Sequence, residues 1–84
     1  MTGWITVNAI AEAWRVPITS HLFPEVSVHL LAASRLAGPL EFVTWAAPLL
    51  EEPLTAQGGM VAVPEKPGLG IAFDRAAVGH YRVV

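Results

Sequence analysis

The segment 16–25, VPITSHLFPE, constrains the fold of this chain more than any other. Pro17 disfavours a helical conformation for the residue before it, so the chain is expected to be extended there. The apolar run 16–20 lacks the alternation of a half-buried strand, which indicates a short strand buried on both faces. His21 follows it, and Pro24 with its neighbouring glutamate suits the first turn of a helix. The segment therefore predicts a strand-to-helix junction that carries a titratable residue.

A helix is predicted on the N-terminal side of this junction, over residues 4–14. Val7, Ile10, Ala11 and Trp14 recur at i, i+3, i+4 and i+7, which is the spacing of one apolar helical stripe. We expect this stripe, and the tryptophans in general, to belong to the core.

A second helix and a second strand are predicted after the junction. The helix runs over residues 24–35, and Gly38 and Pro39 end the connection that follows. Residues 40–44 form the second strand, which is apolar except for Glu41. The order helix, strand, helix, strand with short links predicts an α/β architecture with parallel strands and helical crossovers.

The pattern changes beyond residue 45. Residues 46–53 form a proline-punctuated connection with two solvated glutamates. Residues 54–63 are predicted to form a hairpin that turns on Gly58 and Gly59. Asp74 is expected to cap a short terminal helix.

The composition is that of the interior of a larger protein. Of the 84 residues, 54% are hydrophobic and 14% charged, whereas about 25% charged residues are usual. A chain of this length buries only roughly 60–65% of its unfolded surface, less than a larger protein does. With no cysteine to cross-link it, its stability in isolation is doubtful. The net charge of −2 gives no nucleic-acid footprint, and no apolar run approaches the ~20 residues of a membrane span. Without cysteine or a recognisable signal peptide, we expect a cytoplasmic protein.

Two polar residues lie at positions where a catalytic or ligand-binding role is possible. His21, taken alone, is either a hydrogen-bonded structural histidine or a catalytic base at the carboxyl end of a strand. Glu41 lies in an apolar strand, so it needs a donor, a cation, a ligand or a solvent-facing strand end. Two such groups at the ends of successive parallel strands can face one cleft. The spacing of His21, Glu25 and His29 is not that of a zinc hydrolase, and no metal site is expected here.

The residues also resemble a known family. The matching runs are TGWI at 2–5, VPITSHLFPEVS at 16–27, HLLAA at 29–33, LE at 40–41, GG at 58–59, VP at 63–64 and PGLG at 67–70, followed by Tyr81. In this order they resemble the C-terminal region of mandelate racemase-type enzymes of the enolase superfamily, over nearly the whole chain.

The resemblance implies the C-terminal portion of a (β/α)8 barrel, from its sixth helix to its eighth strand. Residues from about 1 to 52 would be βα units of the barrel. Residues from about 53 to 84 would be a tail with a hairpin, running towards a capping domain that this chain lacks.

The resemblance also implies roles for particular residues. His21 would exchange the proton α to a substrate carboxylate, and Glu41 would hydrogen-bond that carboxylate as it becomes an enediolate. Leu22 and Val43 would be walls of the substrate pocket. The family uses Mg²⁺ with a histidine or lysine base, acts on α-hydroxy acids or acid sugars, and is expected to be homo-oligomeric.

Several parts of the family pattern are missing from these 84 residues. The three carboxylate metal ligands, the aspartate that orients the histidine and the lysine motif would all precede Met1. We therefore expect the chain alone to hold no Mg²⁺ and to be inactive. The sequence does not distinguish racemisation from dehydration as the reaction of the complete enzyme. The alternative hypothesis is a non-catalytic, stand-alone fragment or interaction module that associates with another piece of a barrel.

Overall fold

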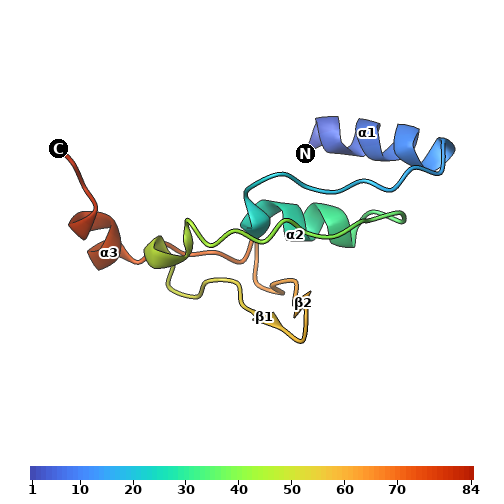
Figure 1. Cartoon of the computed structure of the whole chain (residues 1–84). Helices are drawn as coiled ribbons and strands as arrows, with labels where there is room; N and C mark the ends of the chain where they lie inside the picture. The colour runs from blue at the N-terminus through green and yellow to red at the C-terminus, as the bar shows by residue number, and fades with distance from the viewer. The chain divides into compact units, whose positions relative to one another are not determined.

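The computed structural model describes all 84 residues, which form two compact units over residues 1–43 and 44–84 (Figure 1). The N-terminal unit holds the helices α1 (Thr2–Ala13) and α2 (Pro24–Ala32). The C-terminal unit holds a short 3₁₀ helix η1 (Ala47–Leu49), the strands β1 (Ala56–Gln57) and β2 (Met60–Val61), and the helix α3 (Arg75–His80). The three predicted α-helices and the hairpin are therefore present, with bounds that differ from the predicted ones by a few residues.

Helix α1 ends in a turn that redirects the chain into the extended segment before His21. The backbone N–H of Val16 donates to the carbonyl of Ala11 at 2.9 Å, and that of Arg15 donates to the carbonyl of Glu12 at 3.1 Å. Arg15 has a φ of 55°, in the left-handed region. These two bonds and the left-handed residue form a Schellman motif, which satisfies carbonyls at the helix end.

Helix α2 starts at Pro24 as predicted but ends at Ala32, three residues earlier than predicted. The hydroxyl of Ser34 donates to the carbonyl of Leu30 at 2.8 Å and accepts from the indole Nε1–H of Trp4 at 3.0 Å. A serine that bonds to nearby backbone competes with continued helix. Ser34 thus ends α2 and links its end to α1.

The two predicted strands of the N-terminal unit are not formed as strands, which corrects that prediction. The residues 16–20 and 36–38 share a single parallel bridge, Ile18 with Ala37, and residues 40–44 have no backbone ladder. The bridge has the predicted parallel sense, with the Ile18 N–H donating to the Leu36 carbonyl at 3.0 Å. A ladder needs repeated pairing with a neighbouring strand, and this unit offers each segment too few partners.

Gly38 lies where these two segments approach most closely. A Cβ atom on Gly38 would lie 2.6 Å from Cγ2 of Thr19, and the Gly38 N–H donates to the Ile18 carbonyl at 2.7 Å. The glycine therefore has a packing role in addition to ending the connection.

The C-terminal unit confirms the predicted hairpin turn. Ala56 pairs with Val61 and Gln57 with Met60 in an antiparallel register. Gly58 and Gly59 have φ values of 57° and 76°, which fit a two-residue turn with both central residues left-handed. A second antiparallel bridge joins Leu50 to Phe73 and leads the chain to α3.

The core is much smaller than the sequence predicts. The buried apolar residues are Ala11, Val28, Leu31 and Leu50. In the predicted α1 stripe, Val7 is 55%, Ile10 57% and Trp14 78% exposed, and Trp45 is 75% exposed. The core prediction is confirmed for Ala11 and wrong for Val7, Ile10, Trp14 and Trp45, because periodicity identifies an apolar face but does not supply an element that covers it.

The cap of α3 provides a test of the local structure. The Asp74 carboxylate accepts from the backbone N–H groups of Ala76 at 2.8 Å and Ala77 at 3.1 Å. Asp74→Ala should destabilise α3 by about 1 kcal/mol and speed hydrogen exchange at these two amides. Asp74→Asn, which keeps an accepting oxygen, should retain most of the protection. Unchanged exchange in Asp74→Ala would show that the cap contributes nothing.

Candidate active site

His21 is followed by two residues in a backbone conformation that L-amino acids rarely adopt. Leu22 has a φ of 59° and Phe23 a φ of 47°, both in the left-handed region. Such residues cost about 1–3 kcal/mol each and persist where the surrounding contacts hold them. The turn therefore needs specific support, which comes from a carboxylate and from the first turn of α2.

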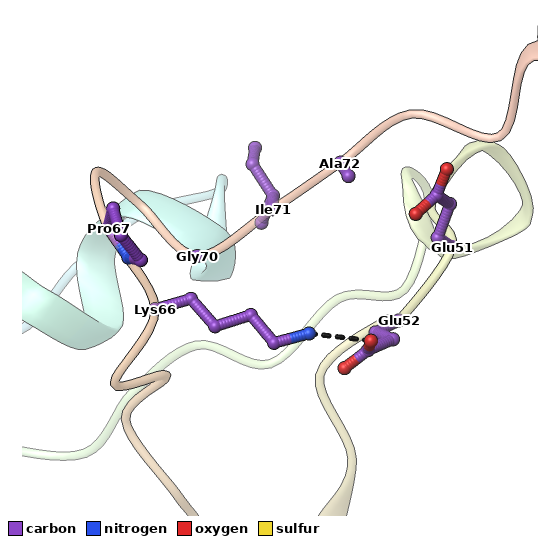
Figure 2. Close-up of a pocket in the computed structure, with 7 residues that line it drawn as sticks. All are labelled: Glu51, Glu52, Lys66, Pro67, Gly70, Ile71 and Ala72. Atoms are coloured by element: carbon purple, nitrogen blue, oxygen red, sulfur yellow. Dashed lines mark hydrogen bonds and ion pairs between the residues drawn. The ribbon is translucent and has the colours of Figure 1, made fainter.

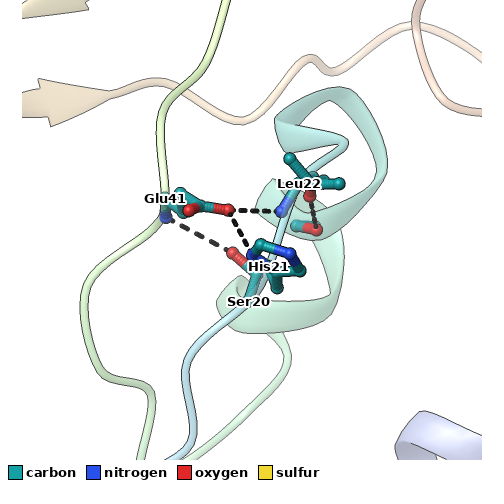
Figure 3. A network of polar contacts seen from close by, with 5 residues as sticks. Ser20, His21, Leu22 and Glu41 are labelled. Carbon is teal, nitrogen blue, oxygen red and sulfur yellow. Dashed lines mark hydrogen bonds and ion pairs between the residues drawn. The ribbon is translucent and has the colours of Figure 1, made fainter.

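Glu41 supplies the carboxylate (Figure 3). Its Oε2 accepts a hydrogen bond from the backbone N–H of Leu22 and lies 3.1 Å from Nδ1 of His21. The backbone N–H of Glu41 donates to the hydroxyl of the buried Ser20 at 3.4 Å. One side chain thus joins the segment around residue 41 to the histidine turn.

Helix α2 supports the other side of the turn. The hydroxyl of Ser27 donates to the Leu22 carbonyl at 3.0 Å. The carbonyl of Phe23 accepts from the N–H groups of Val26 at 3.0 Å and Ser27 at 2.9 Å. These bonds fix the left-handed turn to the beginning of α2, so the orientation of His21 depends on the position of that helix.

The two titratable groups are accessible to a ligand. The His21 side chain is 81% exposed and that of Glu41 is 40% exposed. With Nδ1 of His21 facing the carboxylate, a neutral imidazole is expected to carry its proton on Nδ1. Its Nε2 then has a lone pair that can accept a proton. Glu41 Oε1 forms no hydrogen bond within the chain. The pair therefore presents one proton acceptor and one carboxyl oxygen to a ligand.

Comparison with known proteins identifies the family. The family described as "Enolase C-terminal domain-like" matches residues 1–77. The chain belongs to this family.

Two solved structures have a closely similar fold. An enolase from alpha proteobacterium BAL199, with bound magnesium, is 39% identical with a TM-score of 0.90, over 95% of this chain and 22% of that one. An enolase from Bradyrhizobium, in complex with magnesium and mandelic acid, is 39% identical with a TM-score of 0.89, over 99% of this chain and 23% of that one.

A curated relative is similar along almost the whole chain. The 3,6-anhydro-alpha-L-galactonate cycloisomerase of Streptomyces coelicolor is 30% identical over 83 residues, which are 98% of this chain and 23% of the relative. The chain thus spans under a quarter of the length of the relatives it matches. The resemblance to the enolase superfamily is confirmed, and the α/β fold is that of part of its barrel domain.

The other residues of interest in this enolase-superfamily chain have separate positions. The backbone of Leu22 contacts Glu41, and Leu22 and Val43 are both half-buried. No three histidine, aspartate or glutamate side chains lie close enough together to hold a metal ion. No helix is both long and apolar enough to cross a membrane.

The C-terminal unit has a small hollow of its own (Figure 2). It has a volume of about 170 Å³ and is lined by Glu51, Glu52, Lys66, Pro67, Gly70, Ile71 and Ala72. Lys66 Nζ lies 2.5 Å from Glu52 Oε1, and both side chains are more than half exposed. Exposed pairs of this kind contribute about 0–1 kcal/mol. The prediction that the two glutamates are solvated is confirmed, because both residues are exposed.

The role of Glu41 in holding the turn can be tested without any assay of activity. Glu41→Ala should speed hydrogen exchange at the Leu22 amide about 10- to 100-fold, because a bond to a charged acceptor contributes about 1.5–3 kcal/mol. Glu41→Gln, whose side-chain oxygen can still accept, should retain most of the protection. Glu65→Ala, at an exposed position, is the control. Equal exchange in Glu41→Ala and the unmodified chain would contradict this assignment.

Proposed function

We propose that this chain carries the proton-transfer pair of a Mg²⁺-dependent racemase or acid-sugar dehydratase of the enolase superfamily. The observation that carries the proposal is the contact between Glu41 and both His21 and the Leu22 amide. It brings together, from segments 20 residues apart, the histidine that we propose as the base and the glutamate that we propose as the acid.

The same proposal assigns each segment of the N-terminal unit to a helix or strand of the complete barrel. Helix α1 would be the sixth barrel helix, residues 16–20 the seventh strand, α2 the seventh helix and residues 40–43 the eighth strand. The tail from about residue 53 would run towards a capping domain.

The reaction would begin with the base. Nε2 of His21 accepts the α-proton as the C–H bond breaks, and the electron pair moves into the substrate carboxylate to form an enediolate. In the substrate complex, a proton held on Oε1 would let Glu41 donate a hydrogen bond to the oxygen on which charge develops, while Oε2 still accepts from the Leu22 amide. Placed donors of this kind stabilise such charge more effectively than water does. Return of a proton to the carbon would give racemisation, and loss of a β-hydroxyl would give dehydration.

The substrate class proposed is an α-hydroxy acid or an acid sugar. Mandelic acid in the Bradyrhizobium complex is an α-hydroxy acid, and the Streptomyces relative is a galactonate cycloisomerase. We propose Leu22 and Val43 as walls of the substrate pocket. Leu22 follows His21 directly, and Val43 is two residues after Glu41. The complete enzyme is proposed to be a cytoplasmic homo-oligomer.

Magnesium is present in both solved relatives. The residues of this chain do not fit the ion, because no three potential ligands among them lie close together. We therefore propose that Mg²⁺ is held by parts of the complete enzyme outside residues 1–84, and we assign no step of the reaction of His21 and Glu41 to it.

A second candidate function is a non-catalytic module that associates with another piece of a barrel. The exposed apolar face of α1, with Ile10 and Trp14 more than half accessible, favours it. The same experiment distinguishes the two functions, because a non-catalytic module would give no α-proton exchange in any complete protein that contains this chain.

The proposal is tested in a complete barrel that contains residues 1–84. This can be the parent protein or a chimera in which the chain replaces the matching segment of the Bradyrhizobium enolase. His21→Asn should lower exchange of the substrate α-proton with deuterated solvent at least about 100-fold, since a positioned base contributes about 10²- to 10⁴-fold. The exchange is followed by proton NMR.

The matched control is His80→Asn, which changes an exposed histidine at the end of α3. It should leave the rate within about twofold of the unmodified protein, as expected for a surface substitution. Undiminished exchange in His21→Asn would contradict the proposed role of the histidine.

A further inference from the structure

Leu22 is the residue through which Glu41 and helix α2 hold the same turn. Its backbone N–H donates to Oε2 of Glu41, and its carbonyl accepts from the hydroxyl of Ser27 at 3.0 Å (Figure 3). No backbone amide donates to that carbonyl. The N–H of Leu22 is therefore held by the proposed acid, and its carbonyl is held by a single hydroxyl.

Ser27 is a buried serine whose hydroxyl bonds beyond its own helix. The residue is 7% exposed, and a buried hydroxyl needs a hydrogen-bond partner. A serine in or next to a helix usually bonds to the carbonyl four residues earlier, as Ser34 does with Leu30 at 2.8 Å. For Ser27 that carbonyl belongs to Phe23, which already accepts from two backbone N–H groups. The hydroxyl instead bonds to Leu22, which is five residues earlier and outside α2.

The two bonds of Leu22 determine the direction in which His21 points. A peptide unit is planar, so the Leu22 N–H lies in one plane with the carbonyl group and the Cα of His21. The Leu22 carbonyl belongs to the next plane, and only φ and ψ of Leu22 separate the two planes. With both groups bonded these angles are fixed, although a φ of 59° is unfavourable for a residue with a Cβ atom. Loss of either bond lets the turn relax and moves His21 relative to Glu41.

We propose that Ser27 is a positioning residue for the proton-transfer pair, and this inference rests on the proposed function. Its hydroxyl bonds to neither His21 nor Glu41. It holds Leu22 in the left-handed conformation in which the Leu22 N–H and Nδ1 of His21 both face Oε2 of Glu41. Removal of the hydroxyl is expected to weaken the contact between His21 and Glu41 and to slow proton transfer.

The test uses the complete barrel described above. Ser27→Ala removes the hydroxyl and should lower kcat for α-proton exchange about 3- to 10-fold, which corresponds to the loss of one neutral hydrogen bond. In the same variant, long-range ¹H–¹⁵N NMR should show a smaller share of neutral His21 rings with the proton on Nδ1. Ser27→Thr keeps a hydroxyl and should restore most of both. A Ser27→Ala variant that leaves either kcat or the ring tautomer unchanged overturns the proposal.

Ser34→Ala is the matched control. It removes a hydroxyl that also bonds to a backbone carbonyl, but next to the other end of α2 and away from the histidine turn. The two variants should lower the free energy of unfolding by similar amounts, whereas Ser34→Ala should leave kcat within about twofold and the His21 tautomer unchanged. An equal loss of kcat in both variants would show that general destabilisation is the cause, and it overturns the proposal.

A second variant keeps the test decisive if Ser27→Ala does not fold. Ser27→Cys fills the space of the hydroxyl with a thiol, which is only a weak donor. Its kcat and its share of His21 rings with the proton on Nδ1 should both be lower than those of the unmodified protein. A Cys variant with the kcat and the tautomer of the unmodified protein overturns the need for the hydroxyl.

Failure of the proposed function would be recognised separately, because the unmodified barrel would then show no α-proton exchange. The positioning role is in that case judged by hydrogen exchange of the Leu22 amide, which bonds to Glu41 and not to Ser27. Ser27→Ala should speed this exchange about 3- to 10-fold, as expected for the loss of a neutral hydrogen bond that supports the turn. Ser34→Ala should leave it unchanged. Equal exchange in both variants overturns the positioning role.

Discussion

The carboxylate of Glu41 is the interaction on which the N-terminal unit depends. It accepts from the Leu22 amide and contacts His21 with the same oxygen, while its own backbone N–H is bonded to Ser20. The left-handed pair Leu22 and Phe23 costs about 1–3 kcal/mol per residue. A hydrogen bond to a charged acceptor contributes about 1.5–3 kcal/mol and each neutral bond from α2 about 0.5–1.5 kcal/mol. These magnitudes are comparable, so the contacts are sufficient to hold the turn without a glycine.

The same contacts link structure to the proposed chemistry. A histidine on a flexible loop would have no fixed direction, whereas here its ring nitrogen faces a carboxylate that is itself tied to the neighbouring backbone. Preorganisation of this kind lets a base and an acid act without rearrangement at the moment of reaction. The large exposed fraction of His21 means that exclusion of water must come from residues outside this chain.

The exposed apolar surface is explained by the small share of the family's fold that the chain contains. Val28 and Leu31 are buried on α2, whereas on the apolar face of α1 only Ala11 is buried and Ile10 and Trp14 are exposed. The two solved relatives match 95% and 99% of this chain but only 22% and 23% of their own length. Part of a barrel keeps the hydrophobic pattern of the whole, so apolar side chains such as Trp14 are exposed where this chain supplies no neighbour.

Sequence reasoning located the helices, the hairpin and the pair of polar residues because each has a local signal. Gly58 and Gly59 mark the hairpin and Asp74 caps α3. His21 follows one apolar segment and Glu41 lies in another. It could not predict the left-handed turn, because neither Leu22 nor Phe23 is a residue type that signals it. The strand ladders and the core were overestimated for a related reason.

Pattern specifies which face of an element is apolar, and a partner decides whether that face is covered. The apolar runs at 16–20 and 40–44 are those of buried strands, yet the first has one bridge, from Ile18 to Ala37, and the second has none. The end of α2 was misplaced because the hydrogen bonds of Ser34 to Leu30 and Trp4 depend on tertiary contact.

The protonation of the His21 ring tests the central claim most directly. Long-range ¹H–¹⁵N NMR of the complete barrel distinguishes the two tautomers of a neutral imidazole. If Nδ1 donates to Glu41, the proton must be on Nδ1 and Nε2 must be bare, and Glu41→Ala should remove that preference. A His21 ring that carries its proton on Nε2, or whose tautomer is unaffected by Glu41→Ala, would contradict the account.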